Sequence, residues 1–211
     1  MKEYKLPIGC DVPETIILAD GDFPSHPLAL EWLRQCPYVV CCDGAANTYI
    51  RSGRMPEAIV GDGDSLLPDI KERYASLIHS EAEQEINDLS KAFRFCLSQE
   101  RKRITIMGAT GKREDHTIGN VSLLADYMEQ AEVSMMTDYG IFVPIREDSM
   151  FESYIGQQIS VFNMNSTALS AEGLAYPLSV FTNWWQGTLN EALARHFIIR
   201  TEGKVLVFRV F

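Results

Sequence analysis

The sequence lacks the patterns that assign many proteins to a class at once. None of its five cysteines forms a Cys-x-x-Cys pair, and no Cys/His cluster has zinc spacing. Neither a disulfide framework nor a zinc site is therefore indicated, and reduced core thiols are expected. The motifs His-Glu-x-x-His and Gly-x-Ser-x-Gly are also absent, which leaves zinc proteases and serine hydrolases without support.

Long apolar runs and an excess of basic residues are missing too. No run approaches the length of a membrane-spanning helix, and residues 1–10 have neither the apolar region nor the cleavage site of a signal peptide. The net charge of −10 repels nucleic-acid phosphate. We expect a soluble, cytoplasmic protein with no nucleic-acid and no membrane partner. Any nucleotide site must supply its own cations, which favours a bound metal.

What the chain does contain, over its first two thirds, is an alternation of short apolar runs with helical patterns. Strands are expected at 15–19, 38–42, 58–60, 76–79, 104–107 and 132–136, and helices at 27–35, 45–52, from 87 or 88 onward, and at 118–128. Strands that alternate with helices build a parallel sheet. Residues 1–137 are therefore predicted to form a doubly wound α/β domain with a mostly parallel sheet.

From about Asp138 the pattern changes to short strands separated by glycines. These strands are expected at 141–143, 158–162, 167–170, 197–200 and 205–211. Glu202-Gly203, between the last two, indicates a hairpin-like turn. Residues 138–211 are thus predicted to be a small all-β domain, too small to be very stable alone. It should pack on the first domain or on a second subunit.

Each of the first five expected strands is followed by an acidic or glycine-rich segment. These segments are Asp20-Gly21-Asp22, Asp43-Gly44, Gly61-Asp62-Gly63-Asp64-Ser65, Glu81 to Glu85 with Asp88, and Gly108-Ala109-Thr110-Gly111. The carboxyl ends of parallel strands meet at one edge of an open sheet, where ligands bind, so the acids should converge. Turn formation explains one Asp-Gly pair, but it is a strained explanation for five loops on one edge.

Converging acids favour a metal. Two carboxylates about 4 Å apart repel by roughly 1–4 kcal/mol, depending on the local dielectric. Mg²⁺ removes this cost because it binds carboxylate oxygens and substrate phosphates together. We predict that Asp62 and Asp64 bind Mg²⁺, with Asp43 and Asp88 as further ligands, in an enzyme that transfers a phosphate-bearing group.

Glycines in these loops allow unusual backbone angles and the close approach of a phosphate. The glycines concerned are Gly61, Gly63, Gly108 and Gly111. The string from Gly108 to Arg113 is not a Walker A loop, because its spacing is short and Arg113 stands where Ser or Thr belongs. Arg113 can bind a phosphate in a bidentate way. Lys112 is expected to be a solvated surface charge.

Three further features each allow two interpretations. Asp115 can be a helix N-cap and His116 a first-turn polar residue, or both can belong to the site. Trp184-Trp185 is an aromatic pair in a polar segment. Core packing is its ordinary explanation, and stacking on a flat heteroaromatic ring is the alternative.

Five motifs in order along most of the chain resemble the thiamine pyrophosphokinase family. They are Cys42 to Asn47; Pro56 to Ser65; Glu83 to Asp88 with Lys91-Ala92; Gly108 to Asn120; and the C-terminal stretches Gly173 to Leu178 and Gly187 to Glu191. The chain departs from the family pattern at some positions. Gly63 replaces an aromatic residue, Lys112 a glycine, and Leu189 a serine expected to touch thiamine. Glu83 and Glu85 replace aspartates, and Asn87 replaces a threonine.

The resemblance implies an α/β domain followed by a small β-sandwich, paired as a homodimer. It implies a reaction in which ATP and thiamine give thiamine diphosphate and AMP, with Asp43, Asp62, Asp64 and Asp88 holding Mg²⁺ and the triphosphate. The implied ATP contacts are Gly44, Gly61, Ser65, Gln84, Lys91, Gly108, Gly111, Arg113, Asp115 and His116. The implied thiamine contacts, at the dimer interface, are Thr188, Asn190, Trp184 and Trp185.

Two other functions stay open. One is a Mg²⁺-dependent enzyme that uses the Asp-x-Asp loop for a nucleotide-sugar or a phosphate ester. It would not make AMP from ATP. The other is a non-catalytic sensor of nucleotide or thiamine on the same fold, which would not need acidic residues on four loops.

Overall fold

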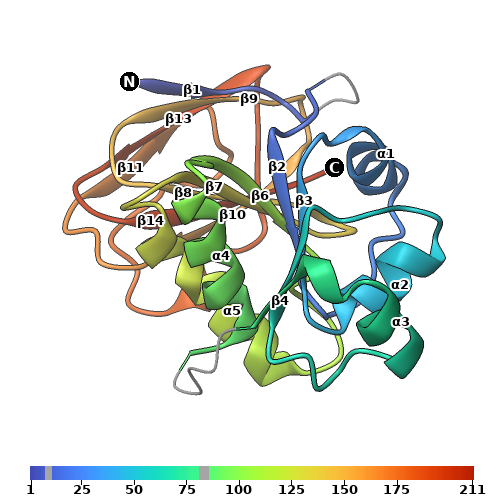
Figure 1. Cartoon of the computed structure of the whole chain (residues 1–211). Coiled ribbons are helices and arrows are strands. Elements are labelled where there is room, and N and C mark those ends of the chain that lie inside the picture. Colours follow the sequence, from blue (N-terminus) through green and yellow to red (C-terminus); the bar gives the residue numbers. More distant parts are fainter. Residues whose placement is uncertain (8–10, 81–85) are drawn as a thin grey trace.

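Two sheets and five α-helices make up the part of the computed structural model that is described, residues 1–7, 11–80 and 86–211 (Figure 1). The larger sheet has ten strands in the order β12-β10-β14-β8-β7-β6-β2-β3-β4-β5. Six of them run parallel: β2 (Thr15–Leu18), β3 (Val39–Cys42), β4 (Ala58–Gly61), β5 (Ile78–Ser80), β6 (Arg103–Met107) and β7 (Glu132–Met136).

Helices cover both faces of the parallel strands, as predicted for a doubly wound domain. One face packs against α1 (Pro27–Gln35), α2 (Ala45–Arg51) and α3 (Pro68–Arg73), the other against α4 (Asp88–Ser98) and α5 (Glu114–Tyr127). Successive strand residues point to opposite faces, so Ile16 and Leu18 join the first core and Ile17 the second. This two-sided burial explains why β2, β3 and β4 are apolar at nearly every position. None of the described helices is both long and apolar enough for a membrane span.

The antiparallel part continues the same sheet. β8 (Gly140–Ile145) pairs with β7 and is followed across the sheet by β14 (Val205–Val210), β10 (Gln158–Asn163) and β12 (Asn190–Glu191). A second sheet packs on these strands, in the order β1 (Lys2–Tyr4), β9 (Ser149–Glu152), β13 (His196–Thr201) and β11 (Leu169–Glu172). Phe151 lies at the centre of this sandwich, stacked between Tyr4 at 4.8 Å and Phe197 at 5.0 Å.

Some element predictions need correction. The hairpin-like turn at Glu202-Gly203 is wrong, because β13 and β14 belong to different sheets and the turn carries the chain from one to the other. The strand predicted at 76–79 begins at Ile78, after a 3₁₀ turn over Ala75–Leu77. The helix predicted from 118 begins at Glu114. Several short elements, including α3, β1 and β9, were not predicted because they lack a long apolar pattern.

Asp138, just after β7, forms hydrogen bonds with the end of the loop that connects β2 to α1. Its carboxylate accepts hydrogen bonds from Ser25 N (2.8 Å), Ser25 Oγ (2.5 Å) and His26 N (2.9 Å). His26 is the N-cap of α1, and its ring stacks on Phe211 with centroids 4.5 Å apart. The start of α1 is therefore held by residues from the β7–β8 turn and from the C-terminus.

Asp138→Ala should lower the free energy of unfolding by about 1–2 kcal/mol, the usual cost of losing a helix-terminal hydrogen-bond acceptor. Burial would raise the pKa of Asp138, but the hydrogen bonds from Ser25 and His26 outweigh it and lower the pKa. The stabilisation is therefore present at neutral pH and is lost as pH falls through this lowered pKa. Urea unfolding at pH 7 and pH 3 tests this. Equal differences between wild type and variant at both pH values would contradict it.

Candidate active site

Three carboxylates meet at the carboxyl edge of the parallel strands. Asp43 follows β3, and Asp62 and Asp64 follow the adjacent β4. One oxygen from each side chain lies within 4.8 Å of the others. Asp43 is 2% exposed, whereas Asp62 and Asp64 are open to solvent. The predicted convergence of these three acids is confirmed.

The close approach of two backbone segments and several hydrogen bonds build this cluster. A Cβ atom at Gly61 would lie 2.8 Å from Asp43 Cβ, so only glycine lets β4 pass so close. Asp43 itself has φ +27°. Its Oδ2 accepts a hydrogen bond from Ser65 N at 3.1 Å, and Asp62 Oδ1 accepts one from Asp64 N at 3.1 Å. Ser65 Oγ donates to Asp64 Oδ1 at 3.0 Å.

The electrostatics of the cluster suit the binding of a cation. Burial first, and the neighbouring carboxylates in addition, raise the pKa of Asp43 to about 6, against the lowering effect of the hydrogen bond from Ser65 N. Hydrogen bonds, that from Ser65 first, hold the pKa of Asp64 below its usual range. Asp43 Oδ1 is buried and has no hydrogen-bond partner. A buried, unpartnered oxygen beside two exposed carboxylates is an all-oxygen donor set that suits a hard divalent cation.

Asp88 lies near this cluster but is not one of its three converging members. It is the first residue of α4, and its Oδ1 accepts a hydrogen bond from Lys91 Nζ at 2.9 Å. Its charge contributes to the raised pKa of Asp43. Lys91, predicted as an ATP contact, is 5% exposed, and its ammonium is paired with Asp88. Gln84 lies outside the described residues.

The loops after β2 and β6 flank the point where the strand order reverses. β2 has β3 on one side and β6 on the other, which is where open α/β sheets bind ligands. Gly21 N donates to Gly108 O at 2.6 Å, and Asp22 N donates to Thr110 O at 2.9 Å. These bonds join the two loops into one surface.

The glycines of this edge are needed first for loop packing. A Cβ atom at Gly111 would clash with the Asp22 carboxylate, and one at Gly44 would lie 2.6 Å from Asp20 Oδ2. At Gly111, where φ is +79°, this close approach and the backbone conformation both favour glycine, whether or not a phosphate is bound. A cavity of about 140 Å³ opens beside Asp20 and Asp22.

The basic residues after β6 are engaged with acids. Lys112, expected to be a solvated charge, donates from Nζ to Asp20 O at 2.8 Å and to Asp20 Oδ1 at 3.1 Å. Arg113 binds Asp115 in a bidentate way, with Nε–Oδ1 3.0 Å and Nη2–Oδ2 2.5 Å. This pairing lowers the pKa of Asp115 to about 2. Asp115 is not the N-cap, because Arg113 holds that position and Asp115 lies in the first turn with the exposed His116.

The predicted thiamine contacts lie at the far end of the sheet. Trp185 is 73% exposed, so core packing is the wrong interpretation for it, and Trp184 packs edge-on against Phe162 at 5.9 Å. Thr188 Oγ1 donates to Trp185 O at 2.7 Å. Asn190 is buried, and its side-chain amide accepts a hydrogen bond from Tyr176 N and donates one to Tyr176 O. Within one chain these residues, around β10 and β12, are separated from β3 and β4 by most of the sheet.

Two residues that hold the loop of Asp62 and Asp64 in place were not among the site residues predicted from the sequence. Asn47 of α2 donates from Nδ2 to Ser65 O at 2.8 Å and accepts from Leu67 N at 3.0 Å. Lys71 of α3 donates from Nζ to Gly63 O at 2.7 Å. Asn47 had a signal, since it belongs to the motif that begins at Cys42. Lys71 had none, because α3 itself was not predicted.

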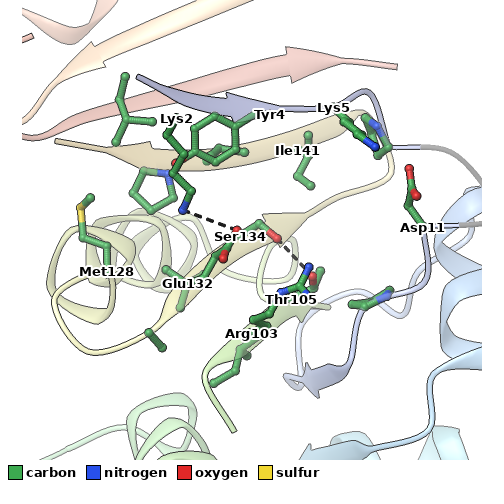
Figure 2. Close-up of a pocket in the computed structure, with 18 of the residues that line it drawn as sticks. Lys2, Tyr4, Lys5, Asp11, Arg103, Thr105, Met128, Glu132, Ser134 and Ile141 are labelled. Carbon is green, nitrogen blue, oxygen red and sulfur yellow. Dashed lines mark hydrogen bonds and ion pairs between the residues drawn. The ribbon is translucent and has the colours of Figure 1, made fainter. Parts of the chain in front are cut away.

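A larger cavity, also lined by described residues, lies elsewhere. It measures about 880 Å³ and lies between the N-terminal residues and the first residues of β6 and β7. Figure 2 shows Lys2 beside Glu132, with nitrogen and oxygen 3.5 Å apart, and Thr105 beside Ser134, with hydroxyls 3.1 Å apart. This is the amino edge of the parallel strands, opposite the acids, so cavity size alone does not locate the acidic site.

Comparison with known proteins assigns a family to this arrangement. Residues 29–136 match the model described as thiamin pyrophosphokinase, catalytic domain, and residues 140–208 match its substrate-binding domain. The chain belongs to the thiamin pyrophosphokinase family. The first match contains Asp43, Asp62 and Asp64. The second contains Trp185 and Asn190.

Individual members of the family support this assignment over part of the chain. Thiamine pyrophosphokinase 1 of Oryza sativa subsp. japonica is 29% identical over 129 residues, 49% of this chain and 49% of that protein. Thiamin pyrophosphokinase 1 of Caenorhabditis elegans is 30% identical over 110 residues, 48% and 45% of the two chains. The aligned region thus spans about half the length of these curated relatives.

Solved structures share the fold along the whole chain. The thiamin pyrophosphokinase from Candida albicans superimposes with a TM-score of 0.81 at 18% identity, covering 100% of this chain and 93% of that one. The Bacillus subtilis thiamine pyrophosphokinase gives 0.77 at 20% identity, covering 93% and 98%. At this identity the likeness establishes the fold, an α/β sheet domain followed by a β-sandwich.

Proposed function

We propose that this protein is a thiamine pyrophosphokinase, which transfers diphosphate from ATP to the hydroxyl of thiamine and releases AMP. Its product, thiamine diphosphate, is an enzyme cofactor. The observation that carries the proposal is the convergence of Asp43, Asp62 and Asp64 at the carboxyl edge, in a chain that matches both domains of the family. The charge of −10 supports it too, because such a chain needs a cation to hold ATP.

In this proposal Asp43, Asp62 and Asp64 hold Mg²⁺, with Asp88 beside them. The buried, unpartnered Oδ1 of Asp43 supports this set. A bound Mg²⁺ supplies charge neutralisation at the phosphate oxygens. With its pKa raised to about 6, Asp43 is mostly ionised at neutral pH, which is the form that binds a cation.

Phosphoryl chemistry of this kind depends on positioning and electrostatics more than on covalent help. The thiamine hydroxyl releases its proton as its oxygen forms a bond to the β-phosphorus, the bond from that phosphorus to the α,β-bridging oxygen breaks, and AMP leaves with the bridging oxygen. Positioning alone can lower the barrier by roughly 7–11 kcal/mol. The proposed ATP contacts are Gly44, Gly61, Ser65, Gln84, Lys91, Gly108, Gly111, Arg113, Asp115 and His116. Arg113 can reach a phosphate by exchanging its bidentate partner Asp115 for one.

We propose further that two copies of the chain form a homodimer and that thiamine binds between them. Trp184, Trp185, Thr188 and Asn190 lie at the end of the sheet opposite the acids, so a second subunit is needed to bring the two sets together. The exposure of Trp185 supports a stacking partner outside its own chain. In this arrangement Asn190 acts by holding Tyr176, because both its amide atoms are used there.

The division into residues 1–137 and 138–211 is also a proposal. It is supported by the family matches, which end at 136 and resume at 140. A cytoplasmic location is proposed on the free thiols of the described cysteines Cys36, Cys41, Cys42 and Cys96.

Incubation with ATP, Mg²⁺ and thiamine, followed by mass spectrometry, tests the function. We expect thiamine diphosphate and AMP in equal amounts, and neither when thiamine is omitted. ATP labelled at its β- and γ-phosphates should pass both labels to the product. ADP in place of AMP would indicate a different transferase, and binding of ATP without turnover would indicate the sensor.

A further inference from the structure

The loop that carries Asp62 and Asp64 accepts a hydrogen bond from the ammonium of a lysine on a neighbouring helix. Lys71, on α3, donates from Nζ to Gly63 O at 2.7 Å. Gly63 stands between the two acids, so the bonded carbonyl belongs to the peptide that joins Gly63 to Asp64. The other bonds of the two acidic side chains, from Asp64 N to Asp62 and from Ser65 Oγ to Asp64, stay within the loop.

The contact with Lys71 lies next to the position that a side chain at Gly63 would occupy. Gly63 has φ +76°, a left-handed conformation that glycine adopts without cost. A Cβ atom there would lie 3.2 Å from Lys71 Nζ and 3.4 Å from Lys71 Cε. The lysine chain therefore covers the face of Gly63 on which any side chain would begin.

The same glycine is the weak point of the loop. Glycine has more backbone freedom to lose than any other residue, and the carboxylates on either side of Gly63 repel each other when no cation is bound. Both effects favour an open loop in which Asp62 and Asp64 are further apart. A hydrogen bond from an ammonium to the carbonyl between them opposes this opening.

We propose that Lys71 is a positioning residue for the divalent-cation site: its ammonium fixes the Gly63 carbonyl and so sets the spacing of the Asp62 and Asp64 carboxylates. This inference rests on the proposed function, which assigns the cation to these acids. Lys71 acts through the loop and is not itself a ligand of the cation. Groups that orient metal ligands from outside typically change metal affinity by about 10–100-fold when removed, and the exposed Lys71 belongs at the lower end of that range.

Mn²⁺ binding to the metal-free protein tests the proposal without any turnover. Electron paramagnetic resonance measures free Mn²⁺ during titration of wild type, Lys71→Met, Lys71→Arg and Arg73→Met. Arg73 is the matched control, because it lies on the same helix with the same charge but places its guanidinium over the Tyr74 ring, 5.5 Å away. We expect Lys71→Met to weaken Mn²⁺ binding by about 10-fold. Lys71→Arg should retain most of the affinity, and Arg73→Met should match wild type.

The metal-free melting temperature of Lys71→Met should stay close to that of wild type, because Lys71 is exposed. Wild-type affinity in Lys71→Met would overturn the positioning role and leave the proposed function standing. Equal weakening in Lys71→Met and Arg73→Met would also overturn it, because the effect would then not depend on the bond to Gly63 O. Loss of a positive charge by itself would strengthen Mn²⁺ binding, so weakening is not an effect of net charge. Failure of wild type to bind Mn²⁺ would remove the cation site and the proposed function together.

Discussion

Asp62→Asn and Asp64→Asn are each expected to abolish turnover and to leave the fold intact. Both side chains are exposed, and neither belongs to a hydrophobic core. The amide oxygen of asparagine can still accept the hydrogen bonds from Asp64 N and Ser65 Oγ, so the loop keeps its local contacts. What each variant loses is a negative ligand. We expect kcat to fall by more than about 100-fold, the upper range for residues that merely support a metal ligand.

The measurement is AMP release at saturating ATP and thiamine, over a range of Mg²⁺ concentrations, with circular dichroism and melting temperature recorded in parallel. Asp69→Asn is the matched control, because Asp69 is an exposed acid on α3 outside the cluster. It should keep wild-type activity, which excludes a general effect of net charge. Turnover retained in either Asp62→Asn or Asp64→Asn would contradict the assignment of these acids to the cation.

The cluster of Asp43, Asp62 and Asp64 could be predicted because its position follows from where the buried strands end. Strands that are buried on both faces are apolar at nearly every position, so their ends are visible in the sequence. The acids that come next must then lie at the carboxyl edge. β3 and β4 are neighbours, which brings Asp43 within reach of Asp62 and Asp64. This result required only that the alternation of strands and helices, and hence the parallel sheet, be predicted correctly.

The contacts of single side chains could not be predicted in the same way. Asp88 begins a helix, and its partner is Lys91, three residues on, rather than the other acids. Lys112 is paired with Asp20, ninety-two residues away in sequence. Such pairings depend on which loops become neighbours, and strand order across the sheet decides that. The turn at Glu202-Gly203 shows the same limit, because the three-residue link between β13 and β14 would have the same sequence pattern within one sheet as between two sheets.

Asp43→Asn should have opposite effects on stability and on function. In the absence of divalent cations, the variant should be more stable than wild type at pH 8. Burial raises the pKa of Asp43 to about 6, well above the value of about 4 for an aspartate in an unfolded chain. The folded protein therefore binds this proton more tightly than the unfolded protein does. The contribution of Asp43 to stability is lost as pH rises from about 4 to about 6.

The size of this loss is on the order of 2–3 kcal/mol, since each pKa unit corresponds to about 1.4 kcal/mol. Asparagine avoids it because its side chain is neutral at every pH. The residue has φ +27°, and asparagine tolerates positive φ about as well as aspartate does. Its amide oxygen can accept from Ser65 N, as Asp43 Oδ2 does now. The amide nitrogen can donate to Asp64, where two carboxylates now face each other.

Urea unfolding at pH 5 and pH 8, with EDTA or with Mg²⁺, separates the two effects. In EDTA, wild type should lose stability relative to Asp43→Asn between pH 5 and pH 8. Mg²⁺ should stabilise wild type by about 2.7 kcal/mol when its concentration is 100 times the dissociation constant. The variant should gain little, and it should not turn over ATP. Lower stability of the variant in EDTA at pH 8, or equal stabilisation of both proteins by Mg²⁺, would contradict the prediction. Asp43 would then destabilise the metal-free protein, and only a bound cation would offset this cost. Asparagine would give the more stable metal-free fold, so the presence of aspartate at this position is explained by ligand binding.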